Sequence, residues 1–258
     1  MIYTCYEMVR DCRADRPEGW RYFLSSYIPV IRRLLAHYAP GRPDLLEPVL
    51  EAVRRPDSSM FGSMEPAPER QFVAELRQKV LAELGPPVPE SPLALEEVAA
   101  AFEPMTLVEK QAAWIETMGY GPSETGAMLR MAPATVEKIR NRAADLLRGK
   151  VDSWSRSMLV ENGLLLGRAA AAGGAVGCLP AKTFLDVLDG RATWRGREEM
   201  ESHAISCWHC IDHFCRLAEV LEVLRGIQPL SESEAEPFHK LLGIGVQKRP
   251  AWKRWFGA

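Results

Sequence analysis

Apolar residues recur along most of this chain at intervals of three or four positions, and strand signals are scarce. Residues three or four apart lie on one face of an α-helix, so this period predicts an all-α protein. The expected helices span Pro17–Tyr38, Pro43–Arg54, Pro68–Leu84, Ala94–Phe102, Leu107–Met118, Ser123–Arg130, Pro133–Gly149, Lys182–Asp189, Arg197–Arg225 and Ser233–Leu242.

Three stretches interrupt this helical pattern. Arg55–Pro68 is rich in Pro, Ser and Met, Gly85–Pro92 is typical of a stiff extended linker, and Ala169–Gly177 is typical of a flexible linker of small residues. We therefore expect four segments: a helical bundle at 1–84, a second helical unit at 94–150, a unit rich in Cys and His at 177–228, and a final helix with a basic-aromatic tail at 229–258.

The segment from Ser123 to Gly149 has the pattern of a helix-turn-helix. Ser123 is a suitable N-cap for a short helix, Arg130–Ala132 is a tight turn, and Pro133 suits the first turn of a longer helix. Short helix, tight turn and longer helix is the arrangement with which many proteins enter the major groove of DNA.

The longer helix combines an apolar stripe with a basic outer face. The predicted inward residues are Val136, Ile139, Ala143 and Leu146 or Leu147. From Arg130 to Lys150 there are six Lys or Arg and two Asp or Glu, which leaves a net charge of +4. Such a face suits the phosphates of a duplex, although a hairpin with a merely solvated basic face remains an alternative. The candidate DNA-binding residues are Thr135, Lys138, Arg140, Asn141 and Arg142.

Composition and cysteine usage set the cellular context. The 258 residues are 47% hydrophobic and 26% charged, with a net charge of −2, as in ordinary globular proteins. The N-terminus lacks a signal-peptide pattern. The apolar stretch Gly163–Pro180 is interrupted by Arg168, so we interpret this stretch as linker and helix and not as a membrane segment. We therefore expect a cytoplasmic protein without membrane contact, whose reduced thiols favour metal binding over disulfides.

Four residues form the most specific chemical motif of the chain, Cys178-x24-His203-x3-Cys207-x2-Cys210. If Arg197–Arg225 is one helix, the last three lie on one face, and Cys178 supplies a distant fourth ligand. Three thiolates and one imidazole are typical of a closed, tetrahedral Zn²⁺ site. The alternative is a pair of buried free thiols beside a surface histidine.

Other titratable residues have weaker signals. His209, His213 and Cys215 are near the motif and are candidates for supporting or alternative ligands, whereas Cys5 and Cys12 are expected to be core thiols. An enzyme is not expected, because four protein ligands close the metal site and no βαβ pattern accompanies the Cys207–Cys210 pair. The tail, Lys248–Phe256, has the composition to bind nucleic acid, a membrane surface or a groove on its own protein.

The second helical unit resembles a known family. Phe102–Lys110, Tyr120–Thr125 and Thr135–Arg148 resemble region 4 of extracytoplasmic-function sigma factors, and the last helix matches best. The resemblance implies that this unit grips promoter DNA. One departure is Thr125-Gly126, where the family usually carries Ile-Ala.

The N-terminal bundle resembles sigma region 2. Asp15–Tyr38 is similar to its opening helix, and Pro43–Leu50 corresponds to the acidic helix that docks on RNA polymerase, although Pro48 lies inside it. The aromatic and basic set with which the family opens DNA is reduced to Phe72, Arg70, Arg77 and Lys79. A bundle that serves only for packing is the alternative.

The Cys/His segment resembles a second family. Leu179–Arg191 followed by Glu198–Cys210 resembles the zinc-binding anti-sigma domain, whose mark is His-x3-Cys-x2-Cys with a fourth ligand about one helix upstream. In that family the domain clamps a sigma factor and keeps it from polymerase, and some members sense oxidants through the same thiolates.

Together these resemblances predict a sigma-like transcription regulator fused to its own zinc anti-sigma domain. It would bind promoter DNA and RNA polymerase under control of an intramolecular contact with the zinc domain, and removal of Cys178–Ala258 would raise that binding. The alternative is a degenerate sigma-like protein that sequesters another regulator without binding DNA.

Overall fold

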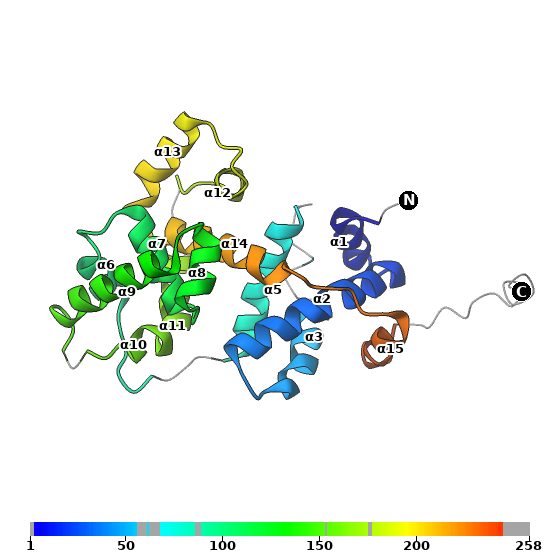
Figure 1. Ribbon diagram of the computed structural model, residues 1–258. Coiled ribbons are helices and arrows are strands. Elements are labelled where there is room, and N and C mark those ends of the chain that lie inside the picture. Colours follow the sequence, from blue (N-terminus) through cyan, green and yellow to red (C-terminus); the bar gives the residue numbers. More distant parts are fainter. Residues whose placement is uncertain are drawn as a thin grey trace, which may run out of the picture. The chain divides into compact units, whose positions relative to one another are not determined.

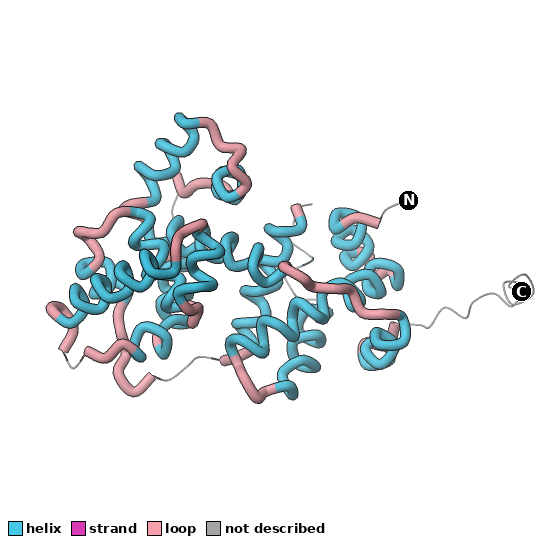
Figure 2. The backbone as a smooth tube through the Cα atoms, viewed as in Figure 1, coloured by secondary structure: helices cyan, strands magenta, loops and turns pink. Residues whose placement is uncertain are grey.

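The structure, a computed structural model, describes residues 3–55, 61, 68–85, 89–152, 154–174 and 177–244. Within these residues all regular secondary structure is helical and no strand occurs (Figures 1 and 2), which confirms the predicted all-α class. The chain forms two compact units: unit 1 comprises Met1–Glu83 with Gly226–Ala258, and unit 2 comprises Leu84–Arg225. Along the sequence, unit 2 is thus inserted into unit 1.

Unit 1 is organised around its longest helix, α2, which packs against α1, α3, α5 and α15. Its core contains a cluster of aromatic rings on α2 and α5, in which Tyr27 and Phe72 lie 4.8 Å apart and Phe23 packs against both. Its elements are α1 (Cys5–Arg13), α2 (Pro17–Tyr38), η1 (Pro43–Leu45), α3 (Leu46–Arg54), α5 (Glu69–Glu83) and α15 (Glu232–Leu241).

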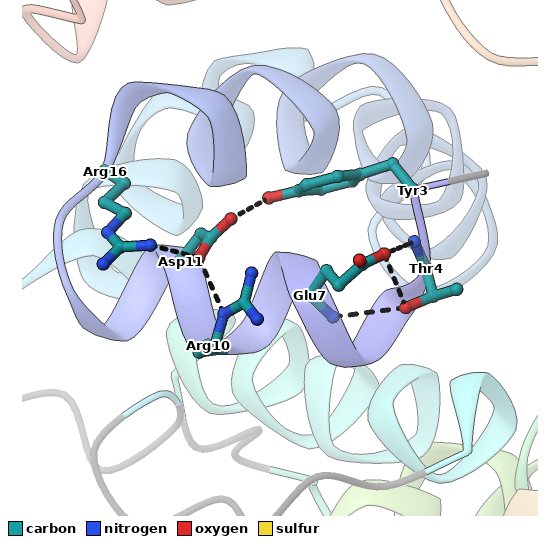
Figure 3. Close-up of polar contacts among 6 residues, drawn as sticks. All are labelled: Tyr3, Thr4, Glu7, Arg10, Asp11 and Arg16. Carbon is teal, nitrogen blue, oxygen red and sulfur yellow. Dashed lines mark hydrogen bonds and ion pairs between the residues drawn. The ribbon is translucent and has the colours of Figure 1, made fainter. Parts of the chain in front are cut away.

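Helix α1 was not predicted, because its short apolar face is interleaved with charged residues. A local signal does mark its start: the Thr4 hydroxyl accepts from the Glu7 amide, and the Glu7 carboxylate accepts from the Thr4 amide, which forms a capping box. The buried Asp11 carboxylate then accepts hydrogen bonds from Tyr3, Arg10 and Arg16 (Figure 3). These bonds fix α1 against the start of α2.

Pro48 does not interrupt a helix. The expected helix Pro43–Arg54 is divided into η1 and α3, and α3 begins at Leu46, so Pro48 lies in its first turn. The backbone N–H groups of a first turn have no partner within the helix, so the proline removes no hydrogen bond there.

Unit 2 is built around α14, which is buried on nearly all sides and contacts α7, α8, α11, α12 and α13. Its elements are α6 (Leu95–Ala101), α7 (Leu107–Thr117), α8 (Pro122–Leu129), α9 (Pro133–Arg148), α10 (Ser157–Glu161), α11 (Gly163–Ala172), α12 (Ala181–Leu188), α13 (Trp194–Ala204) and α14 (Trp208–Leu224). Among them, α10 and the full extent of α11 were not expected.

Three sequence predictions about element boundaries are wrong. Arg197–Arg225 is not one helix, because the chain leaves the helical conformation at Cys207 and begins again as α14. Ala169–Gly177 is not wholly a linker, because α11 continues to Ala172. Ser123 is not the N-cap of α8: Gly121 takes that position, and its N–H donates to the Glu124 carboxylate at 2.9 Å.

The grouping of helices differs from the four segments expected from the sequence. The helices of the expected segments 94–150 and 177–228 lie together in unit 2, and α15 packs on α2 in unit 1. Hydrogen bonds accompany both associations: Trp114 of α7 donates to Asp212 of α14 at 3.1 Å, and the Leu230 amide donates to the Ser25 carbonyl at 2.8 Å. The basic-aromatic tail lies outside the described residues.

Candidate metal centre and helix-turn-helix surface

Cys178, His203, Cys207 and Cys210 come together in unit 2 as a group that could hold a metal ion. Their ligand atoms all lie within 4.8 Å of one another. The Sγ atoms of Cys178 and Cys207 are 3.8 Å apart, and His203 Nε2 lies 3.2 Å from Cys210 Sγ. A tetrahedral site with metal–sulfur bonds of about 2.3 Å requires sulfurs about 3.8 Å apart, so the spacing fits such an ion.

The helix break positions these ligands. His203 lies in the last turn of α13, Cys207 is the extended N-cap residue of α14, and Cys210 lies in the first turn of α14. Lys110 of α7 holds the break, because its ammonium donates to the Ile205 carbonyl at 2.7 Å and lies over the Trp208 ring. The ligands therefore converge from two helices and the turn between them, with Cys178 added from the segment before α12.

Burial opposes charge on the innermost thiol. The pKa of Cys210 is raised to about 12 by burial and by the neighbouring thiols of Cys207 and Cys178. A thiol with such a pKa is neutral at pH 7 in the absence of a cation, whereas a bound metal requires the thiolate. Metal binding at this site must therefore release protons and depend on pH.

The other candidate ligands have different surroundings. A ring nitrogen of His209 lies 3.1 Å from the Ala171 carbonyl, and Cys215 Sγ donates to the Gln111 carbonyl at 3.6 Å. His213 packs on the Phe184 ring, and its pKa is lowered to about 4 by burial and by the nearby Arg216. Among the described residues none of these three belongs to the four-residue group.

The α8–α9 hairpin has the helix-turn-helix shape expected from the sequence (Figure 1). Arg130 ends α8 in the left-handed region, with φ 56°, and Pro133 opens α9. A Cβ atom added at Gly126 would lie 2.6 Å from the Met131 carbonyl oxygen, so the turn requires glycine at this position. The glycine at position 126 thus has a local steric reason.

The two faces of α9 are separated as predicted. Val136, Ile139, Ala143 and Leu147 are buried, and Leu146 is half-buried. Of the DNA-binding candidates, Thr135, Lys138 and Asn141 have exposed side chains. The first turn of α9 contains no acidic residue, so its N-terminal N–H groups remain favourable for an anion.

The two arginine candidates are held by carboxylates of α7. Only 14% of the Arg140 side chain is exposed, and its guanidinium contacts Glu116 at 2.8 Å. Arg142 is exposed, and it contacts the Glu109 carboxylate and the Pro104 carbonyl. The sequence does not predict this pairing, because no local pattern marks Glu116 as a buried residue that contacts an arginine of α9.

Comparisons with known proteins add no relative: no protein-family model, curated protein or solved structure matches this chain. The sigma and anti-sigma resemblances therefore rest on the motifs quoted above. Across the described helices, none combines the length and apolar character needed to cross a lipid bilayer.

Proposed function

We propose that this protein is a DNA-binding transcription regulator, resembling a sigma factor, in which a Zn²⁺ site supports the helix-turn-helix. The observation that carries the proposal is the association of both features in unit 2, where α14 starts at the four-ligand group and packs against α7 and α8. By the same resemblance, unit 1 is the part that would face RNA polymerase.

The exposed side chains of α9 provide the DNA-binding chemistry. Lys138 supplies a positive charge for phosphate, and Thr135 and Asn141 supply the hydroxyl and amide groups that contact phosphates or base edges. Together with the N-terminus of α9, they make a surface suited to one groove of a duplex.

Zinc is the metal that the donor set favours. Three cysteine sulfurs and one imidazole nitrogen are soft or borderline ligands, and four protein ligands leave no open position for substrate. The role we assign to zinc is therefore structural rather than catalytic. Elemental analysis should find one zinc per chain in the wild type and less in Cys178→Ser.

The contacts of α14 suggest how zinc controls DNA binding. Trp114 on α7 bonds Asp212, and Tyr120, just before α8, donates to Glu219 at 2.8 Å in the buried interior. Because α7 and α8 also pack against α9, loss of the metal should weaken DNA binding. If the zinc-binding segment instead covered α9 and blocked DNA, chelation would strengthen DNA binding.

Truncation is a poor test of this control. Removing Cys178–Ala258 would delete α14 from the core of unit 2 and α15 from unit 1. Chelation of the intact chain removes the metal but no helix. Its effect on DNA affinity therefore shows whether the zinc site supports α9 or masks it.

Lys138→Ala tests DNA contact directly, with Lys182→Ala as the matched control. Both lysines are exposed in unit 2, but Lys182 lies on α12 and pairs with Asp186. In gel shifts with a promoter library, Lys138→Ala should lower the slope of log affinity against log salt by about one, whereas the control should not change it. Equal behaviour of the two variants would contradict the assignment of α9.

A second function is favoured by the pairing of the two arginines. With Arg140 held by Glu116 and Arg142 by Glu109, much of the basic charge expected for DNA is already compensated. A chain that sequesters another regulator would show no salt-dependent DNA binding by the wild type, and would instead form a stable complex with a sigma-like protein.

A further inference from the structure

Arg156 lies outside the helix-turn-helix, as the N-cap residue of α10, but its side chain contacts α9. Its Nε donates to Glu116 Oε1 at 2.9 Å, the same oxygen that accepts from Arg140 at 2.8 Å. Only 2% of the Glu116 side chain is exposed. A buried carboxylate thus anchors the inner end of the Arg156 guanidinium, while 40% of the Arg156 side chain remains exposed.

The outer end of the same guanidinium reaches the exposed face of α9. Arg156 Nη1 lies 3.2 Å from Asn141 Oδ1 and 3.4 Å from Glu137 Oε1. Glu137 and Asn141 are four residues apart and therefore neighbours on α9. Arg156 compensates the charge of Glu137, which would otherwise repel the phosphates of a duplex approaching Lys138.

The contact also fixes the orientation of the Asn141 amide. An arginine side chain only donates hydrogen bonds, so the Asn141 atom that faces it must be the oxygen. This bond uses one of the two lone pairs of Oδ1, so Nδ2 and the second lone pair remain for a ligand, in the orientation that Arg156 fixes. An asparagine that pairs with adenine in two hydrogen bonds must use both its oxygen and its nitrogen.

We propose that Arg156 is a positioning residue of the DNA-binding surface, which cancels the Glu137 charge and fixes the orientation of the Asn141 amide. This inference rests on the proposed function, because it concerns the same face of α9. An amide held in one orientation favours one pattern of donors and acceptors on a base edge, whereas an amide that can turn by 180° presents its oxygen and its nitrogen in exchanged positions.

The first test is the base preference of Arg156→Ala, measured by selection from randomised duplex DNA. Without Arg156 the Asn141 amide is free to turn, so the base preference at one position of the selected site should weaken or change. Arg156→Lys keeps the charge beside Glu116 but lacks the planar guanidinium that also reaches Asn141, so it should fold like the wild type and show the same altered preference. Arg195→Ala, which removes an exposed arginine paired with Glu199 on α13, should leave the selected site unchanged.

The second test separates charge from orientation. Arg156→Ala should weaken binding of the wild-type site by about fivefold, because the Glu137 carboxylate is no longer compensated. Glu137→Gln in the Arg156→Ala background should restore affinity without restoring the base preference. A purely structural role for Arg156 predicts neither the rescue nor the altered preference.

The outcomes distinguish this inference from the function on which it rests. Wild-type protein that binds no DNA at low salt would overturn both. Wild-type protein that binds DNA, with Arg156→Ala and Arg156→Lys selecting the same site as the wild type, would overturn the role of Arg156 alone.

Discussion

Two residues of unit 1 that the sequence suggested for DNA contact are buried, whereas two such residues of unit 2 are exposed. In unit 1, Phe72 is fully buried, and Arg77 is buried beside the Tyr38 ring and donates to its hydroxyl at 2.6 Å. In unit 2, Lys138 and Asn141 are exposed on α9. Basic or aromatic character alone therefore does not mark a nucleic-acid surface, because the side of the helix that faces the core decides whether a residue packs or binds.

The largest expected difference between the units is their response to chelation. Metal removal should destabilise unit 2 by roughly 5 kcal/mol, less than the ~10–16 kcal/mol typical of zinc-finger peptides because α14 keeps its other contacts. Hydrogen exchange should show faster exchange in α13 and α14 and unchanged exchange in α2.

Cys210→Ser should reproduce this effect, whereas Cys5→Ser, in unit 1, should not. Equal loss of protection in both units after chelation would contradict an effect confined to unit 2. Unchanged protection throughout would contradict a structural role for the metal.

A glycine substitution tests the hairpin turn of unit 2. Gly126→Ala should destabilise unit 2 by about 2–3 kcal/mol, because its Cβ would overlap the Met131 carbonyl oxygen. Gly149→Ala is the matched control: Gly149 is in the right-handed helical region, and an added Cβ would lie 3.6 Å from the nearest atom. Urea denaturation of the two variants should give opposite or clearly unequal changes, since the control is expected to be neutral or slightly stabilising.

Substitution of a buried basic residue should lower stability but not DNA affinity, and substitution of an exposed one should do the reverse. Arg77→Ala should destabilise unit 1 by about 2 kcal/mol, because it removes a charged partner of the Tyr38 hydroxyl in the interior, and it should leave DNA affinity unchanged. Lys138→Ala should change stability by less than about 0.5 kcal/mol and lower DNA affinity. Loss of DNA affinity in Arg77→Ala, but not in the half-buried control Lys79→Ala, would show that DNA binding requires an intact unit 1.

The fold class, most helices, the α8–α9 hairpin and the four metal-ligand candidates could be predicted from the sequence. Each of them depends on the local hydrophobic period or on the spacing of nearby residues. The break at Cys207 could not be predicted, because it depends on Lys110 reaching the Ile205 carbonyl from 95 residues away. The pairing of Arg140 with Glu116 could not be predicted either, because these two residues belong to different helices. Contacts between distant segments set the details of the site, and a single helical period does not reveal them.

The smallest expected effect is the pH dependence that His213 adds to the stability of unit 2. The pKa of His213 is lowered from about 6.5 to about 4 in the folded protein, first by burial and then by Arg216. The unfolded chain therefore binds the proton more readily below pH 6.5, so acid favours unfolding. Between pH 7 and pH 5.5 this histidine should remove about 1 kcal/mol of stability, and the loss should end near pH 4.

Because the thiol ligands also bind protons as pH falls, the measurement must compare two metal-saturated proteins. His213→Asn removes the titrating ring, so its unfolding free energy should fall less steeply between pH 7 and 5.5 than that of the wild type. If His213→Asn keeps the wild-type slope, the acid sensitivity belongs to other groups, such as the metal ligands or His239 of unit 1, whose pKa is also lowered by burial.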